Sequence, residues 1–231
     1  MRLARRLDPM APARSRGDRR CPICGFEGPF RPAGLSPRPD ALCPGCGSLE
    51  RHRLLRLAAE RSGVFATPGR VLHFAPEAAV TRFIRPLAAD YVTSDPIMPD
   101  VDLRLDVSDM ALEDESVDAV ICIHVLEHVP RDRDALAELR RILRPGGAVL
   151  LDVPMIHAMA ETYEDPSITD PAARLLHFGQ PDHVRQYGRD FPDRAAAAGL
   201  EVTPFETSPR EAVAHALPFG VGLHVARRPA A

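Results

Sequence analysis

The sequence predicts an α/β fold built around a doubly wound, mainly parallel β-sheet. The main evidence is the stretch 101–153, in which the apolar runs 117–125 and 148–153 are short, continuous and β-branched, like parallel strands buried on both faces. Between them, leucine and isoleucine recur at helical spacing over 136–143, and the Pro-Gly-Gly at 145–147 is expected to end that helix. The stretch therefore reads as a strand, an acidic loop and a β-α-β unit.

A second β-α-β unit is expected upstream. It would consist of a short strand within 68–76, an amphipathic helix over 76–89 and a strand over 90–95 that ends on an acid. In doubly wound sheets, ligands bind at the carboxyl ends of the strands, where the strand order reverses. Asp95 lies at such an end, twenty residues after Ala75, where an acid commonly binds ribose hydroxyls. The alternative is an acid that only shapes the turn before the following proline.

Four of the five cysteines form two C-x-x-C pairs, Cys21 with Cys24 and Cys43 with Cys46. This spacing is typical of a four-cysteine structural zinc site, because two such turns present four thiolates to one tetrahedral ion. Four protein ligands leave no open position for chemistry, so this zinc is expected to be structural. Disulfides are the alternative, and nothing in the sequence indicates secretion. Glycines at 25 and 47 suit backbone that wraps around sulfur.

The chain divides into three expected parts. Residues 1–20 are expected to be a disordered basic tail with Met10 as an alternative start, and residues 21–62 a zinc-ribbon-like knuckle followed by a linker helix. Residues 68–231 are expected to form the main domain. The linker helix is expected to begin at an N-cap, Ser48.

Three arginines on this linker helix admit two interpretations: Arg51, Arg53 and Arg56. They could bind a phosphate or another anion, or they could belong to a helix that packs the knuckle against the main domain. The second interpretation is slightly favoured.

Charge is unevenly distributed along the chain. Residues 1–61 hold 13 arginines and six acidic residues, whereas residues 62–231 hold 16 arginines and 26 acidic residues. A basic front end could dock nucleic acid, and a solvated arginine-rich tail is the alternative. No membrane-spanning segment or secretory signal is evident, so a cytoplasmic protein is expected.

Residues 68–231 resemble the class I S-adenosylmethionine-dependent methyltransferases of the type 11 kind, most specifically in LRRILRPGG and DESVD. The resemblance implies a Rossmann-like, seven-stranded sheet whose last strand, within GVGLHVARRP, is antiparallel. It implies S-adenosyl-L-methionine as the cofactor and an insertion at 154–190 over the acceptor pocket. The implied cofactor contacts are Phe74, Ala75, Glu77, Asp95, Asp106, Val107, Ile123 and His124.

The first cofactor loop departs from the family. The family typically has D-x-G-x-G-x-G there, whereas this chain has His-Phe-Ala-Pro-Glu at 73–77, without glycine. The proline removes one N–H donor, and Glu77 would attract the ammonium or sulfonium group of the cofactor. Either the cofactor is held in a modified way, which we favour, or binding has been lost.

The segment 124–128, His-Val-Leu-Glu-His, lies where a catalytic base would be. We predict His128 as this base, with Glu127 beside it; the alternative is that both only shape the pocket. In quinone-pathway O-methyltransferases an E-x-x-E-H segment here holds a divalent metal, but His124 replaces the first glutamate, so this metal is not implied. H-x-x-E-H also matches an inverted zinc-peptidase motif, but a buried strand leads into it and a proline follows it, which argues against the required helix.

The predicted function is therefore a cytoplasmic methyltransferase that acts on a small-molecule or sugar-like acceptor. One alternative is an RNA methyltransferase that docks its substrate through residues 1–61. Another is a non-catalytic binding protein that has kept the fold.

Overall fold

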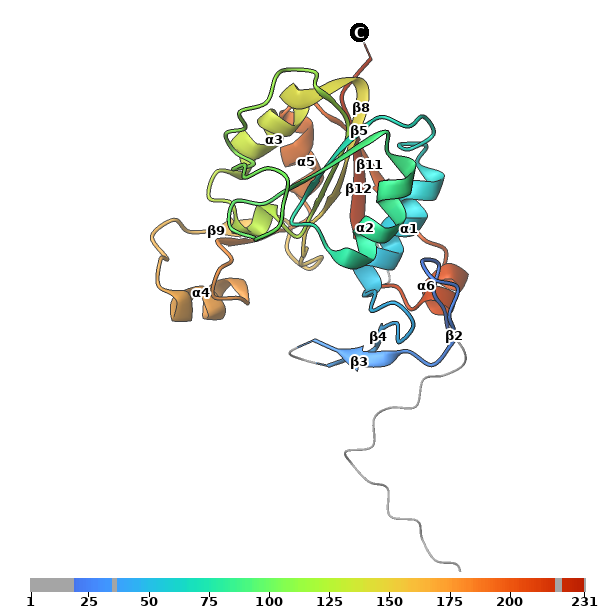
Figure 1. The fold of residues 1–231 in the computed structure, drawn as a ribbon. Helices are drawn as coiled ribbons and strands as arrows, with labels where there is room; N and C mark the ends of the chain where they lie inside the picture. Colours follow the sequence, from blue (N-terminus) through green and yellow to red (C-terminus); the bar gives the residue numbers. More distant parts are fainter. Residues whose placement is uncertain (1–18, 35–36, 219–221, 231) are drawn as a thin grey trace, which may run out of the picture.

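The computed structural model describes residues 19–34, 37–218 and 222–230 (Figure 1). Its centre is a six-stranded sheet with the strand order β11-β12-β8-β7-β5-β6. The bounds of these strands are β5 (Arg70–Phe74), β6 (Asp90–Ser94), β7 (Val117–Ile123), β8 (Leu143–Asp152), β11 (Glu201–Phe205) and β12 (Leu223–Arg227). The neighbouring pairs β5–β6, β5–β7 and β7–β8 are parallel, whereas β12 pairs antiparallel with both β8 and β11. The α/β fold and the antiparallel last strand are thus confirmed.

The seventh predicted strand is not confirmed within the described residues. At the start of the stretch 101–153, a single parallel bridge joins Leu103 to Ser94. Beside this bridge, the carboxylate of Asp102 accepts hydrogen bonds from the backbone N–H and the hydroxyl of Thr93, at 2.8 and 2.6 Å. A side chain therefore satisfies the edge of β6 where a further strand would have continued the ladder.

Helices cover both faces of the sheet (Figure 1). Their bounds are α1 (Glu50–Arg61), α2 (Ala78–Ile84), η1 (Arg85–Leu87), η2 (Leu126–His128), α3 (Asp132–Ile142), α4 (Pro171–Phe178), α5 (Phe191–Ala197) and α6 (Pro209–His215). One apolar cluster packs α1, α2 and α6 against one face, and another packs α3 and α5 against the other. Helix α3 ends at Ile142, before the Pro-Gly-Gly, and β8 already begins at Leu143.

The N-terminal module consists of two small antiparallel hairpins. The first pairs β1 (Arg19–Arg20) with β2 (Glu27–Gly28), and the second pairs β3 (Arg31–Ala33) with β4 (Arg38–Leu42). Residues 1–18 of the expected disordered tail lie outside the described residues. Residues 19 and 20, which were expected to belong to this tail, form β1.

The insertion after β8 projects away from the sheet and carries α4 (Figure 1). Within it, β9 (Tyr163–Glu164) pairs antiparallel with β10 (Arg185–Gln186). The buried guanidinium of Arg185 donates to three backbone carbonyls, of Leu126, Val129 and Pro130. Arg185 therefore fastens the insertion to η2. Among the described helices, none combines the length and the apolar character that crossing a membrane requires.

Candidate active site

The sheet reverses its winding between the adjacent strands β5 and β7, which is where doubly wound proteins bind ligands. Each of these strands is followed by a non-glycine residue with a positive φ, 47° at Ala75 and 52° at His124. Such backbone is strained for residues with a Cβ, and strained residues concentrate at functional sites. The loop without glycine therefore still contains a left-handed residue, at Ala75.

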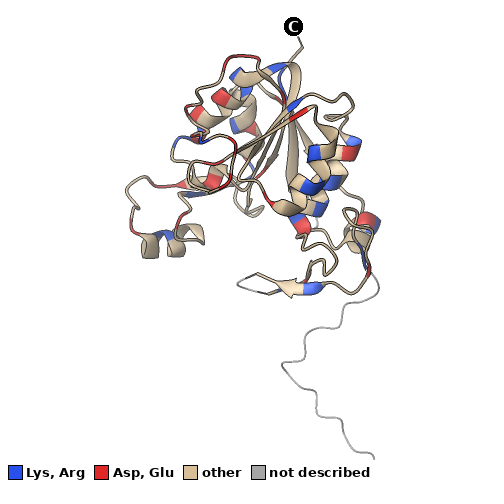
Figure 2. Ribbon diagram, in the orientation of Figure 1, with Lys and Arg blue, Asp and Glu red and all other residues tan. Residues whose placement is uncertain are grey.

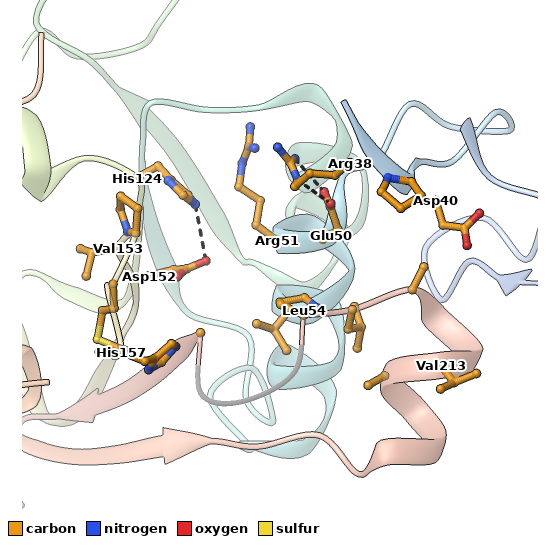
Figure 3. Close-up of a pocket in the computed structure, with 18 of the residues that line it drawn as sticks. Arg38, Asp40, Glu50, Arg51, Leu54, His124, Asp152, Val153, His157 and Val213 are labelled. Atoms are coloured by element: carbon orange, nitrogen blue, oxygen red, sulfur yellow. Dashed lines mark hydrogen bonds and ion pairs between the residues drawn. The ribbon is translucent and has the colours of Figure 1, made fainter. Parts of the chain in front are cut away.

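A cavity of about 690 Å³ opens at the carboxyl ends of β7 and β8 (Figure 3). Its walls come from the main domain through His124 and Asp152, from α1 through Arg51 and from the N-terminal module through Arg38. In Figure 3, His124 and Asp152 face one another on one side of the cavity, opposite α1. The N-terminal module thus forms part of the cavity wall. His128 does not line this cavity.

Three titratable side chains meet beside the cavity, and two of them, His124 and Asp152, line it. His124 Nδ1 lies 3.2 Å from Glu127 Oε1, and His124 Nε2 lies 3.8 Å from Asp152 Oδ2. Burial acts to lower the pKa of His124, but the two carboxylates outweigh it and raise this pKa. Burial raises the pKa of Asp152 to about 7, against the attraction of His124.

Glu77, in the first loop, is paired with helix α1. Arg51 donates two hydrogen bonds to its carboxylate, and His52 Nε2 lies 2.6 Å from Glu77 Oε2. Because His52 Nδ1 accepts the backbone N–H of Leu49, its Nε2 carries the proton and donates to Glu77. Burial alone would raise the pKa of Glu77, but the bonds from His52 and Arg51 hold this pKa at about 2.

The two acids predicted at the cofactor site both shape turns. Asp95 follows β6, and its Oδ1 accepts the backbone N–H groups of Ile97 and Met98 at 2.9 and 2.7 Å. Asp106 Oδ1 accepts the N–H and the hydroxyl of Ser108, and these bonds lower the pKa of Asp106. One oxygen of Asp95 thus shapes the turn, as the alternative interpretation expects.

The four cysteines converge as predicted. Their Sγ atoms all lie within 4.8 Å of one another, and the pairs Cys21–Cys46 and Cys24–Cys43 are each separated by 3.7 Å. All of them are free thiols, so disulfides are excluded in this arrangement. The glycines after each pair have φ values of 75° and 73°, which confirms their predicted role in wrapping the backbone.

The predicted N-cap, Ser48, is wrong. The N-cap of α1 is Leu49, and the hydroxyl of Ser48 instead lies 3.2 Å from Cys46 Sγ and 3.5 Å from Cys21 Sγ. A buried hydroxyl beside two sulfurs finds a hydrogen-bond partner there, which competes with capping the helix.

The arginines of α1 make internal contacts. Arg53 is fully buried and donates to the backbone carbonyls of five residues, Asp40, Ala41, Ser48, His215 and Ala216. Arg56 pairs with Glu60 along the helix. These contacts match the interpretation that the helix packs the knuckle onto the main domain.

Sequence reasoning missed Asp152 and the partners of Glu77. Asp152 ends an apolar strand at the carboxyl edge of the sheet, so the rule that selected Asp95 would also have selected it. The pairing of Arg51 and His52 with Glu77 spans about 25 residues between two modules and had no local signal.

Two sequence comparisons relate the chain to known proteins. Residues 42–151 match a family model described as a methyltransferase domain, Methyltransf_11. A 37.1 kDa protein from transposon TN4556 of Streptomyces fradiae is 37% identical over 73 residues, which make up 31% of this chain and 21% of that protein.

Two solved structures share the fold. One is a 1,6-didemethyltoxoflavin-N1-methyltransferase from Burkholderia thailandensis with bound S-adenosylhomocysteine, at a TM-score of 0.53 and 15% identity over 78% of this chain and 79% of that one. The other is the cyclase SpnF, at a TM-score of 0.51 and 16% identity over 78% and 81%. At these identities the likeness shows the fold alone. Over residues 42–151 the chain therefore matches a methyltransferase domain, and the four-cysteine cluster overlaps the start of this match.

Proposed function

We propose that the protein transfers a methyl group from S-adenosyl-L-methionine to a small-molecule acceptor bound in the cavity beside His124 and Asp152. The observation that carries this proposal is the cavity itself. It lies at the carboxyl ends of β7 and β8, next to the winding reversal, and its volume of about 690 Å³ suits a small ligand.

We propose that the cofactor is bound by the residues predicted from the sequence, which fall into four groups. Phe74, Ala75 and Glu77 form the first loop, Asp95 binds the ribose, Asp106 and Val107 lie at the adenine, and Ile123 and His124 lie at the methionine part. The positive φ of Ala75 supports this assignment, because a glycine of the family would hold the same conformation. Glu77, paired with α1, acts by holding the loop in place.

The cofactor supplies an electrophilic methyl group, and positioning of the acceptor accounts for much of the rate. An acceptor hydroxyl or amine must also lose a proton. We propose that Asp152 and His124, which line the cavity, take up this proton in place of His128. If His128→Ala formed no product while Asp152→Asn remained active, His128 would be the proton acceptor, as predicted from the sequence.

For the cysteine cluster we propose a structural zinc ion. With zinc–sulfur bonds of about 2.3 Å, a tetrahedral site needs sulfur atoms about 3.8 Å apart. The two 3.7 Å separations fit this requirement.

The RNA alternative receives less support. Seven of the eight arginines between residues 19 and 61 pair with acidic side chains or, for Arg53, with backbone carbonyls. Arginines and acidic residues are interspersed over the molecule in Figure 2. Arginines that are already paired neutralise few phosphates and therefore release few of the counterions condensed on a nucleic acid.

Titration calorimetry with S-adenosyl-L-methionine on the zinc-loaded protein tests the proposal. The sharpest variant is Asp95→Asn, because an asparagine keeps the acceptor of the turn and loses the charge. We expect its affinity to fall about tenfold or more, whereas Asp193→Asn, at an exposed position of α5, should bind normally. Absence of binding to the wild-type protein would favour the non-catalytic binding protein.

A further inference from the structure

Outside the acceptor cavity, three potential ligand side chains converge at the base of the insertion. Glu127 and His128 belong to η2, and His183 belongs to the insertion. One ligand atom from each lies within 4.8 Å of those of the other two. We propose that Glu127, His128 and His183 form a second metal site, which binds a divalent transition-metal ion of the zinc class.

The first argument is the environment of Glu127. Its side chain is 1% exposed, and neither carboxylate oxygen has a hydrogen-bond donor among the described residues. His124 Nδ1 lies within ion-pair distance of Glu127 Oε1, but not in hydrogen-bond geometry. A buried carboxylate without donors is costly, and a cation bound at its oxygens removes this cost.

The second argument is the orientation of the two histidines. His128 Nδ1 lies 3.2 Å from Asp182 Oδ2, so its Nε2 is the nitrogen left for a ligand. A carboxylate on the far nitrogen is the usual partner of a metal-binding histidine, because it fixes the ring and raises its basicity. The rings of His128 and His183 meet edge to face with centroids 4.7 Å apart, and one ring nitrogen of each lies within 4.8 Å of the other and of a carboxylate oxygen of Glu127.

The third argument is that the backbone holds the cluster in place. The N–H of Val184 donates to the carbonyl of Glu127 at 2.9 Å, directly beside His183. Arg185 then fastens the same segment to the carbonyls that surround η2. The residues that would bind the ion are thus positioned by contacts that do not involve it.

The donor set determines the kind of ion. Two imidazoles and one carboxylate suit zinc and related transition metals better than magnesium, and three protein ligands leave a position open. His183 also lines a cavity of about 230 Å³, from which a small ligand could reach the ion. His124, at the place of the first glutamate of the quinone-pathway segment, is not part of this cluster.

Zinc content after equilibrium dialysis against zinc, measured by mass spectrometry, tests the site independently of methyl transfer. We expect the wild-type protein to bind one zinc ion more than His183→Ala or Glu127→Gln. The ion in the cysteine cluster should be retained in both. Asp182→Asn should lower the affinity for the second zinc ion by about 10–100-fold, as substitution of the carboxylate partner of a metal-binding histidine usually does. His177→Ala, which removes an exposed histidine of the same insertion, is the matched control and should bind as the wild type does.

A wild-type protein that holds one zinc ion alone at saturation would overturn the proposal. So would a second ion that persists in both His183→Ala and Glu127→Gln. If the buried positions do not tolerate substitution, His128→Ala gives the same information, because about a third of that side chain is exposed and its removal leaves the core intact.

Discussion

At the residue scale, the two strands that flank the winding reversal, β5 and β7, are each followed by a residue with strained backbone. Ala75 and His124 each leave a buried strand in a left-handed conformation, although both carry a Cβ. This conformation costs about 1–2 kcal/mol in a non-glycine residue. At Ala75 the N–H still donates to the carbonyl of Ser94, so β5 and β6 stay paired while the loop turns. The chain thus places a left-handed residue after β5 without a glycine.

Replacing Ala75 by glycine should therefore stabilise the protein by up to about 1 kcal/mol, because relief of strain exceeds the gain in unfolded-state entropy. Urea unfolding of Ala75→Gly measures this change. The matched control is Ala196→Gly at an exposed position of helix α5, which should lose about 1 kcal/mol. A loss of stability of similar size in both variants would show that Ala75 is not strained.

His73 allows a prediction about pH. It is 1% exposed, its Nδ1 lies 2.6 Å from the hydroxyl of Tyr91, and burial lowers its pKa to about 3. Below its unfolded pKa of 6.5, the unfolded state binds a proton that the folded state does not, so His73 makes the fold less stable as pH falls from 6.5 towards 3. Asp152 acts in the opposite direction, because its pKa is raised in the folded state.

Comparison with His73→Gln isolates this effect, because glutamine cannot take up the proton. Between pH 6.5 and 4.5, the stability of the wild type should fall relative to the variant by about 2–3 kcal/mol, at about 1.4 kcal/mol per pKa unit. Chemical unfolding at several pH values measures the difference. A difference that is constant over this range would mean that His73 is protonated in the folded state.

At the scale of elements, α1 joins three parts of the molecule. Its buried Arg53 binds backbone carbonyls of β4, of the cysteine turn and of the end of α6, and it lies 4.7 Å above the ring of Phe30. Its Arg51 and His52 bind the first cofactor loop through Glu77. The helix is therefore a structural connection between the knuckle and the sheet.

Arg53→Lys should destabilise the protein by about 3 kcal/mol or more, because an ammonium group cannot reach the carbonyls that the planar guanidinium joins. Thermal and urea unfolding test this. Arg38→Lys is the control, since the pair of Arg38 with Glu50 is half exposed and should change stability by less than about 1 kcal/mol. Equal effects of the two substitutions would contradict the role of Arg53.

The elements that the sequence predicted well are those with a strong local signal. The runs at 117–125 and 148–153 are continuous and β-branched, and they became β7 and the end of β8. The strand expected near residue 103 is reduced to a single bridge, because the carboxylate of Asp102 takes the N–H of Thr93 at the edge of β6.

The candidate site was predictable only in part. The cysteine cluster followed from spacing, and the carboxyl ends of the strands followed from the rule for doubly wound sheets. The pairs of Glu77 with α1 and of His128 with His183 join residues far apart in the sequence, which no periodicity or spacing reports. These contacts depend on how the modules pack.

At the scale of the whole molecule, short contacts link the cysteine cluster to the loop 73–77, the proposed cofactor loop. Ser48 lies against two sulfurs, the adjacent Leu49 donates its N–H to His52, and His52 donates to Glu77. Glu77 is the N-cap residue of α2, two residues after Ala75. Four residues, Ser48, Leu49, His52 and Glu77, thus form a continuous series of contacts between the knuckle and the loop.

Removal of zinc should therefore weaken cofactor binding, although no cysteine reaches the cofactor loop. A chelated, zinc-free protein should bind S-adenosyl-L-methionine about tenfold more weakly, since metal binding and folding of such a small module are one equilibrium. The zinc-loaded His52→Leu variant should show part of the same loss because it breaks the link and leaves the cluster intact, whereas Arg20→Lys, at an exposed pair of the N-terminal module, should bind normally. Calorimetry of the four proteins measures these affinities. Unchanged affinity after complete zinc removal would mean that the loop holds its conformation without the knuckle, and that the bonds of Glu77 with α1 serve stability alone.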